Sequence, residues 1–252
     1  MATVTQRIRE FKQPRGGYIN PRRLEKTKLE SSVELFPEEN IHPSLIGLSV
    51  DYLSRYISGA TKEEAFEISL KGAFNVRESE KALKLLSEID GLSDQSIINA
   101  TKLVGYDVAY RAGTRFFTKP VDTINPDKDT ISNIREMVNR SKVFFEKFGP
   151  VILDGFSFEG AYTNLITIGD ADFLTKDTLW DFKVTKNPPT NKHTFQILIY
   201  YLMGLRSIHK EKFSNVKRIG FFNPRLNIVH TINISDISKE TIEEVNSKVI
   251  GY

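Results

Sequence analysis

The sequence predicts an α/β fold: a mixed β-sheet flanked by helices, with a helical insertion and a basic N-terminal arm. Helical periodicity dominates residues 42–148, strand-like apolar runs begin at residue 151, and the two patterns alternate from there to the C-terminus. With 252 residues, 40% of them hydrophobic, the chain is long enough to bury a full core. We therefore expect one large domain that carries an insertion.

The first part of the chain is predicted to be a loop followed by helices. Prolines and glycines discourage long elements over residues 1–40, which we expect to be a basic arm and loop. The domain proper is expected over 41–252, with the helical insertion at about 58–149. Apolar residues recur at three- and four-residue spacing from 42 to 57, and helices are then expected over 63–74, 78–88, 96–112 and 130–148.

Strand character begins at residue 151 and continues from 165 to 184. Within it, Thr175-Lys176-Asp177-Thr178 is typical of a hairpin turn. The elements expected after this hairpin are a helix over 195–206, strands over 217–222 and 227–233 around Asn223-Pro224-Arg225, and a helix over 239–249.

Charged residues gather on one face of the first hairpin. If residues 176 and 177 form its loop, Asp172 lies opposite Asp181. The same register places Asp170 opposite Lys183. Side chains two apart on a strand share a face, so three carboxylates and one ammonium would converge. Because such carboxylates repel one another unless a cation lies among them, the pattern predicts a divalent-metal site beside a lysine.

The hairpin resembles that of PD-(D/E)xK nucleases. Gly169-x-x-Asp172 is similar to the acid-bearing second core strand of that superfamily, and Asp181-x-Lys183 to the Asp/Glu-x-Lys motif of its third strand. The resemblance implies a restriction-endonuclease-like core. It also implies that the carbonyl of Phe182 is a backbone metal ligand and that Lys183 orients the attacking water and stabilises the phosphate.

Two further motifs extend the resemblance to the RecB-type branch. Gln196-x-x-x-Tyr200 is similar to a helix motif whose side chains line the site and contact substrate, although Tyr200 could instead be a core aromatic. Gly47-x-x-x-Asp51 has the spacing of a Gly-x-x-x-His motif, with an oxygen ligand in place of the imidazole. The metal ligands that the resemblance implies are Asp51, Asp172, Asp181 and Phe182.

The implied function is a Mg²⁺-dependent deoxyribonuclease, with Mn²⁺ as a substitute, of the kind found in phage replication, repair or defence against foreign DNA. RNA is an alternative substrate, because the same chemistry would cleave it. A non-catalytic nucleic-acid-binding or assembly protein that keeps the fold is the other alternative. The complete set of Asp172, Asp181 and Lys183 favours the enzyme.

Composition adds exclusions. The chain has no Cys, which excludes disulfides, cysteine zinc sites and the iron–sulfur cluster of some RecB-type nucleases. No apolar signal region opens the chain, and its most apolar stretch, 195–205, is too short to span a bilayer. We expect a cytoplasmic protein without a membrane partner.

Positive charge is concentrated at the N-terminus. Residues 1–30 hold eight basic and three acidic side chains, against a net charge of +3 for the whole chain. Such an arm could follow a phosphate backbone, or it could be a solvated tail.

Overall fold

The computed structural model describes residues 2–252, which divide into two compact units. The sheet unit comprises the residues up to Leu29 together with Phe145–Tyr252, and the helical unit comprises Glu30–Phe144. This division differs from the predicted one, because residues before Leu29 belong with the sheet and residues 41–57 belong with the helices. None of the helices in the described part of the chain is long and apolar enough to cross a membrane.

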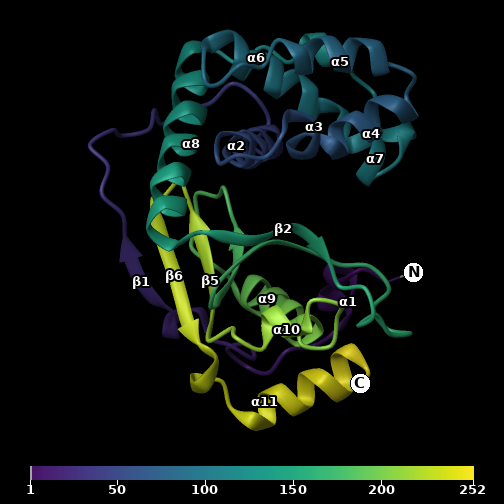
Figure 1. Cartoon of the computed structure of the whole chain (residues 1–252), viewed down its shortest axis with the longest axis vertical. Helices are drawn as coiled ribbons and strands as arrows, with labels where there is room; N and C mark the ends of the chain where they lie inside the picture. The colour runs from purple at the N-terminus through teal and green to yellow at the C-terminus, as the bar shows by residue number, and fades with distance from the viewer. Residues whose placement is uncertain (1) are drawn as a thin grey trace. The chain divides into compact units, whose positions relative to one another are not determined.

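The sheet unit is built on a six-stranded mixed sheet with the order β1-β6-β5-β4-β3-β2. Figure 1 labels four of these strands, β1, β6, β5 and β2. Strands β4 and β5 are parallel, and the other neighbouring pairs are antiparallel. A parallel pair needs a crossover connection, which helix α9 (Asn191–Gly204) provides. The strands are β1 (Glu25–Lys28), β2 (Val151–Ser157), β3 (Asp170–Thr175), β4 (Thr178–Phe182), β5 (Arg218–Asn223) and β6 (Ile228–Asn233).

Both predicted hairpins are confirmed. Phe173 pairs with Trp180 and Leu174 with Leu179, which is the register expected for a loop at residues 176 and 177. Strands β5 and β6 pair on either side of the Asn223-Pro224-Arg225 turn. Strand β3 starts only at Asp170, so the strand expected from residue 165 begins later than predicted.

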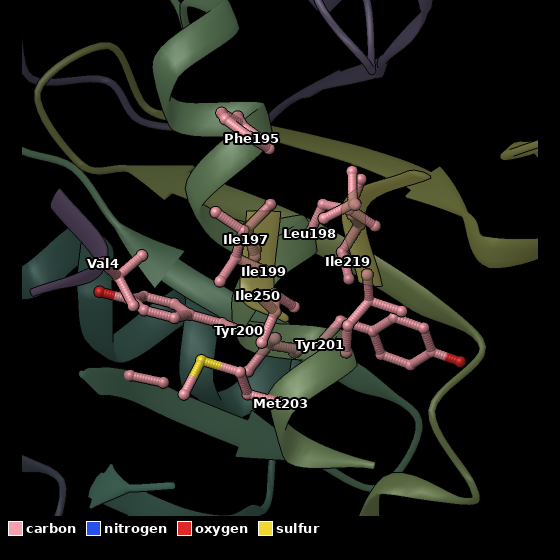
Figure 2. Packing of buried hydrophobic residues seen from close by; sticks show 14 of the residues in the cluster. Val4, Phe195, Ile197, Leu198, Ile199, Tyr200, Tyr201, Met203, Ile219 and Ile250 are labelled. Atoms are coloured by element: carbon pink, nitrogen blue, oxygen red, sulfur yellow. The ribbon is translucent and has the colours of Figure 1, made fainter. Parts of the chain in front are cut away.

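Helix α9 forms the centre of the core in this unit. Ten of its fourteen residues are buried, including Phe195 and Leu198, which Figure 2 shows among other apolar side chains. A helix that is hydrophobic on nearly all sides is stable only when other elements cover it. On the other face of the sheet, Phe148 at the end of α8 packs edge-to-face on Trp180, with 5.3 Å between ring centroids.

The N-terminal segment is not the separate arm that its charge predicted. Helix α1 (Val4–Glu10) begins with a capping box between Thr3 and Gln6. Its Val4 and Ile8 are buried in the core of the sheet unit. Strand β1 pairs antiparallel with β6 at the edge of the sheet. Scattered apolar residues between the charges provide this burial, and they form too short a pattern to be recognised as core in the sequence.

The helical unit contains the expected helices, some of them broken. The 96–112 helix is interrupted at Val104–Tyr106, where Tyr106 meets α4: a Cβ added at Gly72 would lie 2.1 Å from its carbonyl oxygen. The helices are α2 (Pro43–Ile57), α3 (Lys62–Ala65), α4 (Glu67–Asn75), α5 (Ser79–Ser87), α6 (Asp94–Leu103), α7 (Asp107–Arg111) and α8 (Lys128–Phe148), which runs into the sheet unit.

Two short helices complete the sheet unit. Helix α10 (Lys210–Phe213) lies between α9 and β5, and α11 (Lys239–Glu244) follows β6. The predicted 239–249 helix does not keep one geometry, because α11 passes into a π-helical turn over Val245–Ile250. Arg7 of α1 donates hydrogen bonds to the carbonyls of Val249 (2.9 Å) and Lys248 (2.7 Å), which joins the two ends of the chain.

Candidate active site on strands β3 and β4

The structure brings Asp172 and Asp181 to adjacent positions on β3 and β4. Asp172 directly precedes Phe173, and Asp181 directly follows its partner Trp180. The Asp172 carboxylate reaches across to β4, where its Oδ2 accepts a hydrogen bond from the backbone N–H of Phe182 (2.6 Å). The register of the neighbouring pairs is thus the one from which the two acids were predicted to lie opposite each other.

Lys183 and Asp181 form an ion pair within the Asp-x-Lys motif. Nζ of Lys183 lies 2.8 Å from each of the two Asp181 carboxylate oxygens, and Oδ1 accepts its hydrogen bond. Asp181 is only 3% exposed, and its buried Oδ2 receives no hydrogen bond within residues 2–252. Because Oδ2 of Asp181 faces the charge of Lys183 but accepts no hydrogen bond, its lone pairs can still bind a further ligand.

The two carboxylates are electrostatically strained. Burial raises the pKa of Asp172 to about 6, and the negative charge of Asp181 acts in the same direction, against Lys183 and the Phe182 N–H. Burial also raises the pKa of Asp181, although Lys183 lowers it in part. Acids with raised pKa values at one position mark a place where an added cation would be stabilising.

Asp170, the third acid predicted for this face, does not lie opposite Lys183 as expected. Strand β4 ends at Phe182, and the backbone N–H of Lys183 donates to Phe222 of β5 (3.0 Å). Asp170 is therefore not aligned with Lys183 in a β3–β4 ladder; it is exposed and pairs with Ser157 of β2. Its charge still contributes to the raised pKa of Asp172, which makes it a neighbour of the site.

Gln196 and Tyr200 of α9 lie next to the acids. The amide Nε2 of Gln196 donates to the hydroxyl of Tyr200 (2.9 Å), one helical turn away. Burial raises the pKa of Tyr200, and the negative charges of Asp181 and Asp172 add to this effect. Tyr200 is also a buried core aromatic, as one of the two interpretations expected. Its predicted role in contacting substrate stays a prediction.

Gly169 allows this close approach. A Cβ at this position would lie 2.9 Å from Cγ2 of Val4, so a side chain would force Val4 of α1 to shift, and it would lie in ordinary contact with Cε1 of Tyr200 at 3.7 Å. The ring of Tyr200 stacks on Phe158, with centroids 5.2 Å apart. The glycine of the Gly-x-x-Asp motif thus has a packing role beside the acid that follows it.

His193 has a structural role at the start of α9. Its Nδ1 accepts a hydrogen bond from the backbone N–H of Thr190 (3.2 Å) in the capping box of α9. Burial lowers the pKa of His193 to about 4, and the positive charge of Lys183 acts in the same direction. The imidazole is therefore neutral at pH 7 and holds the N-terminus of α9 near the lysine.

Asn223 is a residue of the site that sequence reasoning missed. It is 2% exposed, and its Nδ2 donates to the carbonyl of Thr185 (2.8 Å), two residues beyond Lys183. Its Oδ1 accepts from the backbone N–H groups of Arg225 (3.0 Å) and Leu226 (3.2 Å). The Asn-Pro sequence indicated the turn, but only the β4–β5 pairing brings Asn223 to the segment after the lysine.

Asp51 belongs to the other unit. It lies on α2, four residues after Gly47 and thus one turn further along the helix, and the predicted helix is confirmed. Its role as a metal ligand stays a prediction, as does that of the Phe182 carbonyl. Within residues 2–252, no group of three or more His, Asp or Glu side chains is arranged to hold a metal ion.

Charge is divided unequally between the units. The sheet unit holds 21 basic and 14 acidic side chains, or +7, whereas the helical unit holds 14 and 18, or −4. The Asp172–Asp181 pair therefore lies in the unit whose surface attracts anions.

Comparison of the chain with protein-family models, with curated proteins and with solved structures finds no match in any of the three.

Proposed function

We propose that this protein is a metal-dependent nuclease that hydrolyses DNA phosphodiester bonds, with the PD-(D/E)xK type of site. The observation that carries the proposal is the cluster of Asp172, Asp181 and Lys183, which combines a half-buried acid and a buried one, both of raised pKa, with a lysine bonded to the buried acid. A structural ion pair would need only one acid. A second carboxylate of raised pKa beside the first is costly to the fold and is best explained by a bound cation.

The order of strands supports a restriction-endonuclease-like core. Strands β2, β3 and β4 are consecutive antiparallel neighbours, and α9 then leads to the parallel strand β5. In this series Asp172 is on the second strand and Asp181 on the third, as the PD-(D/E)xK resemblance requires. The mixed sheet with helices on its faces agrees with that architecture.

The donor atoms suit Mg²⁺ or Mn²⁺. Carboxylate oxygens are the ligands that these hard cations prefer, and Oδ2 of Asp181 is buried without a hydrogen bond within residues 2–252. Asp172 and Asp181 would hold the cation, with Asp51 and the Phe182 carbonyl as further proposed ligands. A bound Mg²⁺ would supply positive charge and lower the pKa of an attacking water.

The surrounding side chains would position and stabilise the reacting phosphate. Nζ of Lys183 carries three proton donors and a full charge, so it can bond both a phosphate oxygen and the attacking water. The hydroxyl of Tyr200, held by Gln196, is a second donor directed at the same region. Because these groups are fixed by α9 and β4 before substrate arrives, they would stabilise developing charge without reorganising.

Incubation of the purified protein with closed circular and linear DNA, with Mg²⁺ or Mn²⁺ and with EDTA, tests the proposal. We expect metal-dependent cleavage that is lost in Lys183→Ala and kept in Lys217→Ala, an exposed lysine that directly precedes β5. Cutting of the closed circle would identify an endonuclease. DNA binding without cleavage by the wild type would instead indicate the non-catalytic alternative, and cleavage of RNA alone would redirect the substrate.

A further inference from the structure

We propose that a groove in the helical unit binds an unstacked base of single-stranded DNA. The groove is lined by residues of α4, α5 and α7 and has a volume of about 410 Å³. Figure 1 shows these three helices together within the helical unit, away from α8. The Asp172–Asp181 pair belongs to the other unit. The inference therefore goes beyond the proposed function and needs neither a metal nor cleavage.

Large apolar side chains of the groove are exposed to solvent. Phe74 of α4 is 74% exposed, Leu83 of α5 is 55% exposed and Tyr110 of α7 is 46% exposed. Apolar side chains that gather on one exposed surface usually mark a binding site, because folding otherwise covers them. Phe74 and Tyr110 are aromatic and come from different helices, and aromatic faces are the surfaces on which nucleobases stack.

Hydrogen bonds of buried side chains hold the helices that form the groove. Ser69 of α4 donates to the carboxylate of Asp107 at the start of α7 (2.5 Å). The hydroxyl of Tyr106 donates to the carboxylate of Glu78, which directly precedes α5 (2.6 Å). The aromatic rings are thus attached to a scaffold that exists before a ligand arrives, so binding would cost little ordering.

The charge beside the groove suits a phosphate backbone. Residues 108–121, which continue from α7, contain three basic side chains and no acidic one. Arg77 lies in an adjoining hollow that shares Phe74 with the groove and contains one acid, Glu80. Arg77 and Arg115 are exposed and form no ion pair within residues 2–252, so both charges are available to an anionic ligand.

Cations also lie over two exposed aromatic rings. Cζ of Arg115 is 4.7 Å from the ring centroid of Phe116, and Nζ of Lys71 is 5.8 Å from that of Tyr110. Lys71 is in addition bonded to Glu67, the acid that lines the groove (2.7 Å). Aromatic rings and guanidinium planes both stack on bases, whereas an apolar peptide would need no cations here. The combination therefore favours nucleic acid as the ligand.

The ligand has to be a single strand, because the bases of a duplex are stacked and paired and their faces are not accessible. Asn75 and Ser79 also line the groove, and their side chains can form hydrogen bonds with the edge of a base whose face lies on Phe74 or Tyr110. Arg77 would then contact a phosphate of the same strand.

The test follows binding of a fluorescently labelled 20-nucleotide single strand of DNA by anisotropy in EDTA. Phe74→Ala and Tyr110→Ala should each weaken binding by about 5- to 150-fold, because each removes a surface on which a base stacks. The slope of log K against log salt should stay the same, since no phosphate contact is lost. Phe36→Ala, which truncates an exposed phenylalanine of the same unit outside the groove, should bind as wild type.

The contribution of the cations is measured separately. Arg77→Gln/Arg115→Gln should make the slope of log K against log salt shallower by about 1.4, or about 0.7 for each lost phosphate contact. An abasic strand of the same length keeps the phosphates but has no bases, so wild type and Phe74→Ala should bind it equally.

Phe74→Trp gives a direct readout of stacking. The emission of the introduced indole should be quenched by the DNA strand and not by the abasic strand. Trp180, the one natural tryptophan, is 1% exposed, so wild type supplies the baseline.

Four results would overturn the inference: a wild type that does not bind the single strand, wild-type affinity in Phe74→Ala or Tyr110→Ala, an equal loss in Phe36→Ala, or an equal loss on the abasic strand. Unchanged affinity in the groove variants would leave the groove to another ligand, such as an apolar peptide.

Binding in EDTA does not depend on cleavage, so the two proposals can fail separately. If Phe74→Ala and Tyr110→Ala lose affinity but the wild type does not cut DNA with Mg²⁺, this inference holds and the nuclease assignment fails. If the wild type cuts DNA and both variants bind the strand as well as wild type, the nuclease assignment holds and this inference fails.

Discussion

Nζ of Lys183 lies 2.8 Å from each carboxylate oxygen of Asp181, so the lysine occupies the side of the acid on which a cation would bind. Without a metal, this ion pair partly neutralises a buried carboxylate. With a metal, the same carboxylate would have two positive partners, and the lysine would be turned toward the phosphate. This relationship gives Lys183 and Asp181 opposite expected effects on metal binding.

We expect Lys183→Ala and Asp181→Ala both to abolish DNA cleavage, with a loss of at least about 10²-fold. The two variants should differ in Mn²⁺ affinity measured by calorimetry. Removal of the lysine takes away a competing positive charge, so Lys183→Ala should bind Mn²⁺ at least as tightly as wild type. Asp181→Ala should bind it more weakly. Unchanged cleavage in either variant, with a wild-type circular dichroism spectrum, would contradict the assignment of the site.

The raised pKa of Asp172 predicts a trade-off between stability and function. In the folded chain this pKa is about 6, above the ordinary value of about 4 in the unfolded chain. Between these values the folded state binds more protons, so the free energy of unfolding decreases as the pH rises from about 4 to about 6. Asp172→Asn removes this decrease in stability, because the amide does not ionise, and it keeps an oxygen that can accept the hydrogen bond of the Phe182 N–H.

In the absence of metal, Asp172→Asn should therefore melt at a higher temperature than wild type at pH 7.5, by about 2–4 °C for each kcal/mol recovered. Near pH 4 the two proteins should melt at similar temperatures. Added Mg²⁺ should raise the Tm of wild type but not that of the variant, which should also fail to cleave DNA. A lower Tm for the variant at pH 7.5 without metal would contradict the proposed cost of holding an ionised Asp172 beside Asp181 in this partly buried position.

Tyr200→Phe separates the hydroxyl of Tyr200 from its ring. The change removes the hydrogen bond from Gln196 and keeps the stacking on Phe158, so the free energy of unfolding should change by only about 1 kcal/mol. Cleavage should fall clearly, because a donor near Asp181 is lost. Tyr201→Phe is the matched control: in Figure 2 the hydroxyls of the two tyrosines point away from each other. An equal effect of both changes would indicate only a packing role.

Asn223→Ala should impair cleavage without removing any group from the metal site. Its side chain makes three hydrogen bonds that join the segment after Lys183 to the β5–β6 turn. We expect a loss of about 1–3 kcal/mol in stability and a lower kcat with a wild-type Mn²⁺ affinity. Asn233→Ala, at the exposed opposite end of the β5–β6 hairpin, is the control. A wild-type kcat for Asn223→Ala would show that the segment after Lys183 is held in place without the Asn223 hydrogen bonds.

Asp51 is tested by a pair of substitutions. If it is a metal ligand, Asp51→Ala should lose cleavage and weaken Mn²⁺ binding, whereas Asp51→His, which supplies the residue of the motif it resembles, should retain activity. Both measurements are made on the full chain, with melting temperature as a check on folding. Normal cleavage by Asp51→Ala would end the assignment of Asp51 as a ligand.

Local chemistry was sufficient for the hairpin that carries the acids. A two-residue loop and the alternation of side chains determine which residues are opposite one another, so the Asp172–Asp181 relationship could be predicted from Thr175-Lys176-Asp177-Thr178 alone. The spacing of Gln196 and Tyr200 likewise placed them on one side of a helix, and the structure adds their hydrogen bond.

Contacts between distant parts of the chain needed the tertiary structure. Residues before Leu29 were predicted to be a charged arm because their few apolar side chains are isolated in the sequence. These side chains nevertheless belong to the core of the sheet unit, with elements more than 140 residues away. Val4 and Tyr200, for example, both lie beside Gly169. Asn223 and strand β1 acquire their positions through the β4–β5 and β1–β6 pairings, in which the two strands of each pair are far apart along the chain. A sequence pattern records the period within one element, whereas the pairing of distant strands depends on how the whole core is filled.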